Sequence, residues 1–301
     1  MITRRDFIAQ SSASAALIGA PKLALAELSL GAATLSTVSD GHLTLPGDFA
    51  TANLPSEATD IIKGFGLNTD QFTPECNVTL YRDGTNTVLF DVGSGPDFMP
   101  SAGALQDSLD AVGVGLGDVT HVVFTHAHPD HIWGLLDDFD ELVFPDASYH
   151  MGRAEWDYWW NPETVNTIDA GRTTFAVGAK RRLEILEEQI NFFDDGDEVL
   201  SGIAAVASYG HTPGHMGFEV RSGSESALIV GDAIGNHHLA FHRPEWASNS
   251  DQDSETGITT RKMLLDRLAS EQMAVVGFHL PDGGMGRVVR SDGHFRFVQE
   301  G

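Results

Sequence analysis

The sequence predicts a mixed α/β fold in which helices cover layers of β-sheet. Short runs rich in Val and other apolar residues come first in each half of the chain, and amphipathic helical segments follow them. Polar residues stand directly after several of these runs, at the points where the predicted strands end. With 301 residues, of which 42% are hydrophobic, the chain is long enough to bury the core of one large domain.

A β-hairpin is the first clear element of the chain. Apolar residues at 77–81 and 87–91 flank a turn signal that contains Asp83, Gly84 and Asn86. The Val-rich run 120–124 predicts a strand that ends directly at a group of histidines. Further short strands are expected in this half at 141–144 and 147–151.

The second half predicts two helices between strands. Apolar residues recur at spacings of three and four from Phe175 to Ile190, which is typical of an amphipathic helix. A second helix is expected at 259–271. The expected strands are 202–208, 216–221, 227–230 and 274–278, followed by a closing hairpin made of 287–290 and 294–298.

The first 26 residues predict a secretory signal peptide. Arg4 and Arg5 precede a mildly apolar stretch at 13–20, and a small-residue cleavage pattern ends at Ala26. The paired arginines resemble the twin-arginine signal, which exports proteins that have already folded. The alternative is an ordinary amphipathic N-terminal helix. We therefore expect a periplasmic or secreted protein whose residues 27–301 form one domain.

The charge of the chain limits its classes of partner, and its cysteine content limits its chemistry. The chain has 18 Lys and Arg against 43 Asp and Glu, a formal net charge of −25. Such a surface repels nucleic acid and anionic lipid, so we expect neither as a partner, and no stretch of 27–301 approaches the ~20 apolar residues that span a bilayer. A single cysteine, Cys76, cannot form an internal disulfide, and nothing near it indicates a nucleophile.

A group of potential metal ligands follows the strand predicted at 120–124. His126, His128, Asp130 and His131 place three imidazoles and one carboxylate within six residues. A loop at the end of a strand can aim several side chains into one volume, and these are the ligand types of zinc and other first-row divalent ions. Any one of these histidines alone would read as an ordinary core or surface residue, but the group favours a metal site.

Three later segments place similar residues at strand ends. His211 and His215 lie in the turn Gly-His-Thr-Pro-Gly-His, Asp232 directly follows the apolar run 227–230, and His279 directly follows 274–278. Each of these residues alone would more often be a cap or a turn residue. Together with the group at 126–131, they indicate one composite site.

This ordered set of motifs resembles the metallo-β-lactamase superfamily, from about residue 77 to the C-terminus. The resemblance implies a four-layer αββα sandwich with the metal site at one edge between the sheets. It also implies two metal ions, with Asp232 bridging both and His211 standing behind the ligands. The remaining ligands implied are His126, His128 and His215 for the first ion, and Asp130, His131 and His279 for the second.

Departures from the family pattern favour one branch. True metallo-β-lactamases usually carry Cys or Ser where Asp232 stands, whereas lactonases, glyoxalase II and organophosphate hydrolases carry a bridging Asp. The flavodiiron branch replaces the histidine at the position of His128 with an acid. Four segments look similar to the methyl parathion hydrolase-like group, which includes exported lactonases and phosphotriesterases: 38–42, Asn77, 242–246 and 278–281.

The resemblance implies that a metal-bridging hydroxide opens a lactone or cleaves a related neutral ester, with Asp130 orienting it or relaying a proton. Zinc is the expected metal, and Mn, Co or Fe are alternatives. We expect Trp133, Phe241 and Trp246 to line a hydrophobic substrate pocket, although tryptophans are often core residues. A homodimer is expected by analogy with relatives. The alternatives are a phosphotriesterase on the same site, a β-lactamase, an iron-dependent enzyme of sulfur oxidation, and a non-catalytic zinc-binding protein.

Overall fold

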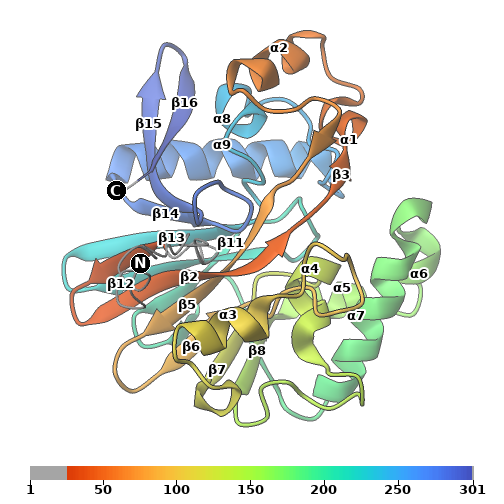
Figure 1. Ribbon diagram of the computed structural model, residues 1–301, viewed down its shortest axis with the longest axis vertical. Helices are drawn as coiled ribbons and strands as arrows, with labels where there is room; N and C mark the ends of the chain where they lie inside the picture. Colours follow the sequence, from red (N-terminus) through yellow and green to blue (C-terminus); the bar gives the residue numbers. More distant parts are fainter. Residues whose placement is uncertain (1–25, 300–301) are drawn as a thin grey trace, which may run out of the picture.

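A computed structural model describes residues 26–299, so the predicted signal peptide lies, apart from Ala26, outside the described residues. Two seven-stranded sheets pack face to face, and helices cover the outer face of each (Figure 1). The predicted α/β class and the αββα layering are confirmed.

The first sheet has the strand order β1-β2-β5-β6-β7-β8-β9. β5 and β6 form the predicted hairpin, and β6 to β9 run parallel to one another. The prediction of a strand at 141–144 is wrong, because this segment forms only an isolated β-bridge between Leu142 and Leu136. The strands are β1 (Glu27–Leu30), β2 (Ala33–His42), β5 (Glu75–Arg82), β6 (Thr87–Phe90), β7 (His121–Phe124), β8 (Ser148–Gly152) and β9 (Ile190–Phe193).

The second sheet has its seven strands in chain order, from β10 to β16. Neighbouring strands are antiparallel except β13 and β14, which are parallel because the longest helix connects them. The strands are β10 (Glu198–Leu200), β11 (Ile203–Ala207), β12 (Met216–Ser222), β13 (Glu225–Gly231), β14 (Ala274–Gly277), β15 (Met285–Ser291) and β16 (His294–Gln299). A separate pair consists of β3 (Leu45–Pro46) and β4 (Gln71–Phe72).

The two predicted helices exist with shifted ends. The first is α7 (Thr173–Leu186), and Ile190 begins β9 instead of ending the helix. The second is α9 (Ser254–Glu271), which begins five residues earlier than expected because the Asp253 side chain caps it by accepting from the Thr256 N–H. None of the helices in residues 26–299 has the length and apolar character needed to cross a bilayer.

The remaining helices are short. One group lies with α7 outside the first sheet, and α8 lies with α9 outside the second (Figure 1). They are α1 (Gly47–Thr51), α2 (Glu57–Gly64), α3 (Leu105–Ala111), α4 (Pro129–Ile132), α5 (Arg153–Trp160), α6 (Thr164–Thr167), α8 (Leu239–His242) and the 3₁₀ turns η1 (Leu116–Asp118), η2 (Trp133–Leu135) and η3 (Ala170–Arg172).

Three apolar layers hold the sandwich together. The layer between the sheets joins residues of both, for example Phe90 and Phe218, whose ring centroids are 5.1 Å apart. A second layer packs the first sheet against α3, α5 and α7, and a third packs the second sheet against α8 and α9. Each fully buried Leu or Phe contributes ~1.5–3 kcal/mol, so these layers fix where the strand ends lie.

Candidate metal centre

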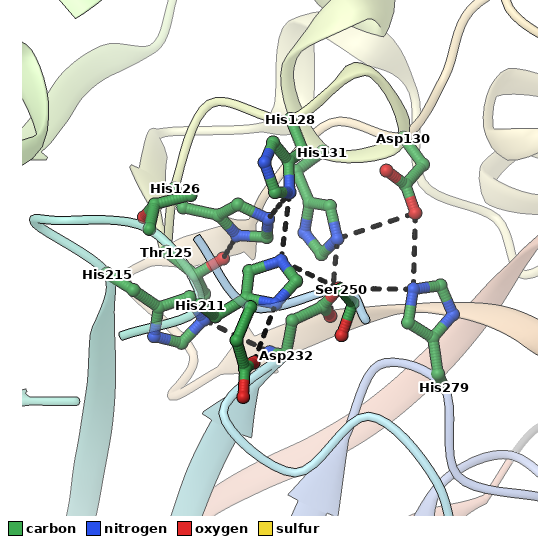
Figure 2. A network of polar contacts seen from close by, with 12 residues as sticks. Thr125, His126, His128, Asp130, His131, His211, His215, Asp232, Ser250 and His279 are labelled. Atoms are coloured by element: carbon green, nitrogen blue, oxygen red, sulfur yellow. Dashed lines mark hydrogen bonds and ion pairs between the residues drawn. The ribbon is translucent and has the colours of Figure 1, made fainter. Parts of the chain in front are cut away.

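Three histidines bring their ring nitrogens together at the end of β7. His126 and His128 follow β7, and His211 reaches them from the loop between β11 and β12 (Figure 2). His128 Nδ1 lies 3.0 Å from His126 Nε2 and 2.8 Å from His211 Nε2. Burial, reinforced by neighbouring histidines, lowers the pKa of His126 and His128 well below the usual range. Their rings are therefore neutral, which is the form that binds metal.

His215 lies beside this group, with its ring centroid 4.9 Å from that of His126. Its Nδ1 is 2.8 Å from Ser208 Oγ, and its Nε2 accepts the Asp232 N–H at 3.1 Å, so protein groups occupy both nitrogens. Gly231, at φ +49°, permits this close approach, because a Cβ there would lie 2.7 Å from His215 Nε2. The assignment of His215 to the first metal and of His211 behind the ligands stays a prediction, since in the structure His211 lies against His128 while both His215 nitrogens contact protein groups.

The physical reason is the shape of the loop. The Ser208 N–H donates to the His215 carbonyl at 3.0 Å, so His215 continues the ladder between β11 and β12. His211 lies at the far end of the loop, where a side chain can reach the end of β7. Sequence spacing alone does not show which histidine of the motif remains on the ladder.

A second group combines carboxylates with imidazoles. Asp130 and His131 lie on α4, while Asp232 and His279 follow β13 and β14. His279 Nε2 is 3.2 Å from Asp130 Oδ2 and 3.3 Å from Asp232 Oδ2. Burial alone would lower the pKa of His131, but the neighbouring carboxylates, Asp232 first, raise it to about 10. Burial likewise opposes ionisation of Asp232, yet His279 and His131 hold its pKa well below the usual range.

Asp232 lies between the two groups. Its Oδ2 is 3.4 Å from His211 Nε2 in the first group, and its Oδ1 is 3.4 Å from His131 Nε2 in the second. Both His131 Nε2 and Asp232 Oδ1 are buried and make no hydrogen bond, so the long ion pair between them is their contact with each other. Buried polar atoms are rarely left without a hydrogen bond, and here these atoms converge with other imidazole and carboxylate donors. The residues therefore fit two divalent ions held by nitrogen and oxygen ligands.

The outer nitrogens of the second group are fixed by buried acceptors. Asp91, directly after β6, lies 2.8 Å from His131 Nδ1 and also accepts from the Thr125 N–H and hydroxyl. The Glu75 carbonyl accepts from His279 Nδ1 at 2.7 Å. These bonds leave Nε2 of each ring to face the site. Sequence reasoning missed Asp91, although an aspartate at a strand end was the signal that identified Asp232.

Glu155, on α5, ties together the two loops that carry the first group. This fully buried carboxylate accepts from the Ala127 N–H at 2.9 Å and from the Gly214 N–H at 3.1 Å. It also accepts from the Thr212 hydroxyl and from the Trp159 indole, both at 2.6 Å. No sequence signal marked Glu155, because an acid within a helix usually faces solvent.

A cavity of about 1400 Å³ opens onto both groups. Its lining includes His128, Asp130, His211, Asp232 and His279. An apolar wall lies beside them, made by side chains that include Leu45, Phe49, Phe72, Phe98, Phe175 and Trp246. The site can therefore bind an apolar molecule and present one polar group to the metal ligands.

Of the three predicted pocket residues, only Trp246 lines this cavity. The prediction for Trp133 is wrong. Its ring, carried by η2, packs against Phe98 at a centroid distance of 5.6 Å and against the Arg182 guanidinium. The prediction for Phe241 is also wrong, because its side chain is fully buried in the apolar layer beneath α8.

The sequence profile of the metallo-beta-lactamase superfamily matches residues 73–271. The chain belongs to this superfamily. The solved structure of AidC, a dizinc quorum-quenching lactonase, is similar to it with a TM-score of 0.85 and 26% identity, covering 92% of this chain and 97% of that one. The hydrolase AbOPH has the same fold, with a TM-score of 0.85 and 23% identity over 92% of this chain and 97% of that one.

Among curated proteins, the N-acyl homoserine lactonase AttM of Agrobacterium fabrum (strain C58 / ATCC 33970) is 27% identical over 125 residues, 41% of this chain and 44% of AttM. The chain spans less than two thirds of the length of the curated relatives it matches. Homologues and structural neighbours are metallo-hydrolases and lactonases, which supports a hydrolase of the lactonase branch.

Proposed function

We propose that this protein is a dinuclear metal-dependent hydrolase that opens lactone rings or cleaves related neutral esters. The observation that carries the proposal is the position of Asp232, whose carboxylate lies between both ligand groups. Asp232 would contact both ions. The other ligands would be His126, His128 and His211 for the first ion, and Asp130, His131 and His279 for the second.

Zinc is the metal we propose, because imidazole and carboxylate donors suit it and the similar AidC is a dizinc enzyme. The same donors accept Mn, Co or Fe. Divalent ions held by these residues would act as Lewis acids that polarise a carbonyl oxygen and lower the pKa of water.

The protein's own groups position the reactants. Asp130 lines the cavity and lies on the side of His279, so we assign it the role of orienting the attacking water and taking up its proton. The water oxygen bonds to the carbonyl carbon, the ring C–O bond breaks, and the leaving alkoxide receives the proton. Cys76 is fully buried in β5 and does not line the cavity, so it is not the nucleophile.

The cavity favours a neutral substrate with an apolar group. Two of its arginines are already paired, Arg243 with Glu57 and Arg261 with Asp251. Carboxylates such as Asp169 and Asp253 also line the cavity, and they repel anions. The apolar wall with Phe98 and Phe175 offers a place for an acyl chain, which the similar AidC structure accommodates as part of a bound product.

The test is a substrate panel on zinc-loaded protein. We expect the highest kcat/KM on N-acyl homoserine lactones, compared with aryl esters, a paraoxon-type triester and a cephalosporin. Chelation should abolish turnover, and added Zn²⁺ should restore it. A clear preference for the triester or the β-lactam would reject the lactonase assignment, and turnover that survives chelation would reject the metal mechanism.

We further propose that residues 1–26 direct export of the folded protein through the twin-arginine route. The support is the Arg4-Arg5 pair together with the small-residue pattern before Glu27. Fractionation of cells that make the full chain should find it outside the cytoplasm. The Arg4→Lys, Arg5→Lys double variant should remain inside, and export of that variant would contradict the proposal.

A further inference from the structure

The outer nitrogen of His128 has an unusual partner. His128 turns Nδ1 toward the first ligand group and Nε2 toward Gln252, whose amide nitrogen lies 3.3 Å away. The Tyr158 hydroxyl donates to the other end of that amide, Gln252 Oε1, at 2.7 Å. Trp159 and Phe175 contact the His128 ring edge to face, at centroid distances of 5.7 and 5.6 Å. Apolar rings therefore flank His128, and Gln252 offers it a polar group.

The chemistry of metal binding defines what Gln252 must present. A histidine that binds a metal through Nδ1 carries its proton on Nε2, which is then a donor. An amide NH₂ cannot accept that proton, whereas an amide oxygen can. A half turn of the Gln252 amide places Oε1 against His128 and the NH₂ against Tyr158. The Tyr158 oxygen can accept as readily as its hydroxyl donates, so both hydrogen bonds survive the half turn.

We propose that Gln252 is a positioning residue for His128: its Oε1 accepts the Nε2–H when a metal occupies the first position, and Tyr158 holds the amide in that orientation. The inference rests on the proposed two-metal function. Hydrogen bonds of this kind fix the tautomer and the angle of a metal-binding imidazole, and they strengthen metal binding.

The segment that carries Gln252 is well placed for this role. The Gln252 N–H donates to the His211 carbonyl at 3.1 Å, and the Asp253 N–H donates to the Gly210 carbonyl at 2.9 Å. Asp251, paired with Arg261, lies 3.7 Å from His211 Nδ1. One short segment therefore supports two of the three histidines in the first group. It also forms part of the cavity wall, so the first metal position is supported from the side on which substrate binds.

The experiment measures the two zinc dissociation constants of metal-free full-length protein by competition with a chromophoric chelator. Gln252→Leu should weaken one of the two ions ~10–100-fold and leave the other unchanged. Gln252→Glu should bind that ion as tightly as the wild type or more tightly, because a carboxylate only accepts. Tyr158→Phe should cause a smaller loss at the same ion. The matched control is Gln71→Leu, the same substitution at an exposed position of the cavity wall, which should change neither constant.

A second measurement separates positioning from folding. Nitrogen-15 spectra of the histidine rings in zinc-loaded protein should show His128 protonated at Nε2, and that proton should exchange faster in Gln252→Leu. Unchanged zinc constants in Gln252→Leu, or weaker zinc binding in Gln252→Glu than in Gln252→Leu, would overturn the inference. So would equal weakening of both ions with a lowered Tm of the metal-free protein. If the wild type binds two zinc ions and Gln252→Leu behaves like it, only this inference fails, whereas a wild type without zinc also rejects the proposed function.

Discussion

The two ligand groups lie side by side but differ in charge. The first consists of histidines alone, and burial lowers the pKa of His126 and His128 so that the rings stay neutral. The second combines two carboxylates with two imidazoles, and despite burial the carboxylates raise the pKa of His131 to about 10. Without metal, the second group is therefore a network of buried ion pairs, while His126 and His128 in the first group are neutral donors. Asp232 is the residue on which both depend.

The strongest test of this comparison is to remove its shared member. Asp232→Ala takes a ligand from both ions and leaves the second-group imidazoles without their main partner, so kcat/KM should fall by roughly 10³-fold or more. Zinc content should fall from two ions toward one or none. Asp157→Ala, an exposed aspartate on α5, is the matched control. Near-normal turnover by Asp232→Ala would show that the two groups do not act together.

The next test distinguishes the two histidines of the Gly-His-Thr-Pro-Gly-His loop. His211→Ala should lose one zinc ion and roughly 10²–10³-fold in kcat/KM, because His211 points into the first group. His215→Ala should retain both ions and instead lose about 1–3 kcal/mol of stability, because it leaves the Asp232 N–H without its acceptor and removes the ring contact of the Ser208 hydroxyl. The opposite pattern would support the assignment made from the sequence, with His215 as the ligand.

Glu155 offers a test that should affect the first group more than the second. It bonds to the loops on both sides of the first group and to neither α4 nor the residues after β14. Glu155→Ala leaves four buried donors unpaired, so the free energy of unfolding of metal-free protein should fall by ~3–5 kcal/mol. The remaining folded protein should bind the first ion more weakly. The control is Glu188→Ala, which changes an exposed acid after α7. If Glu155→Ala lowered the free energy of unfolding by less than about 1 kcal/mol, Glu155 would not hold the two loops together.

The smallest expected effect comes from a histidine outside both groups. His150, on β8, has a buried Nε2 without a partner, and burial together with His121 lowers its pKa to about 4. Because the folded pKa lies below the unfolded value, the contribution of His150 is present above about pH 6.5 and is lost as pH falls toward 4. His150→Gln should reduce the acid-induced loss of unfolding free energy by roughly 1–2 kcal/mol, allowing for partial exposure.

The measurement is denaturant unfolding of metal-free wild type and His150→Gln at pH 7.5 and pH 5. The comparison between the two proteins removes the contribution of the histidines in the metal centre, which both share. An identical pH dependence in the two proteins would mean that burial does not keep His150 neutral.

Sequence patterns predicted the fold and most of the site because both are encoded locally. The apolar runs and the turn residues between them predicted the hairpin of β5 and β6. Asp232 and His279 were identified because each directly follows an apolar run. Helix ends were less accurate, because α9 begins at a side-chain cap instead of at the first apolar residue.

The features that the sequence could not show depend on long-range packing. Whether His211 or His215 faces the site is decided by which of them continues a strand ladder. Trp133 lies behind Phe98, and Gln252 meets His128 across 124 positions of sequence. No local pattern marks such contacts, since they follow from how distant segments pack.

Anomalous diffraction at the zinc absorption edge, from crystals of the zinc-loaded protein, would locate the metal ions directly. We expect two peaks in a shared arrangement, one bound by His126, His128 and His211 and the other in contact with Asp130, His131 and His279, with Asp232 reaching both. Ligand distances should be about 2.0–2.2 Å. A single peak, or a first peak bound by His215 in place of His211, would contradict this arrangement.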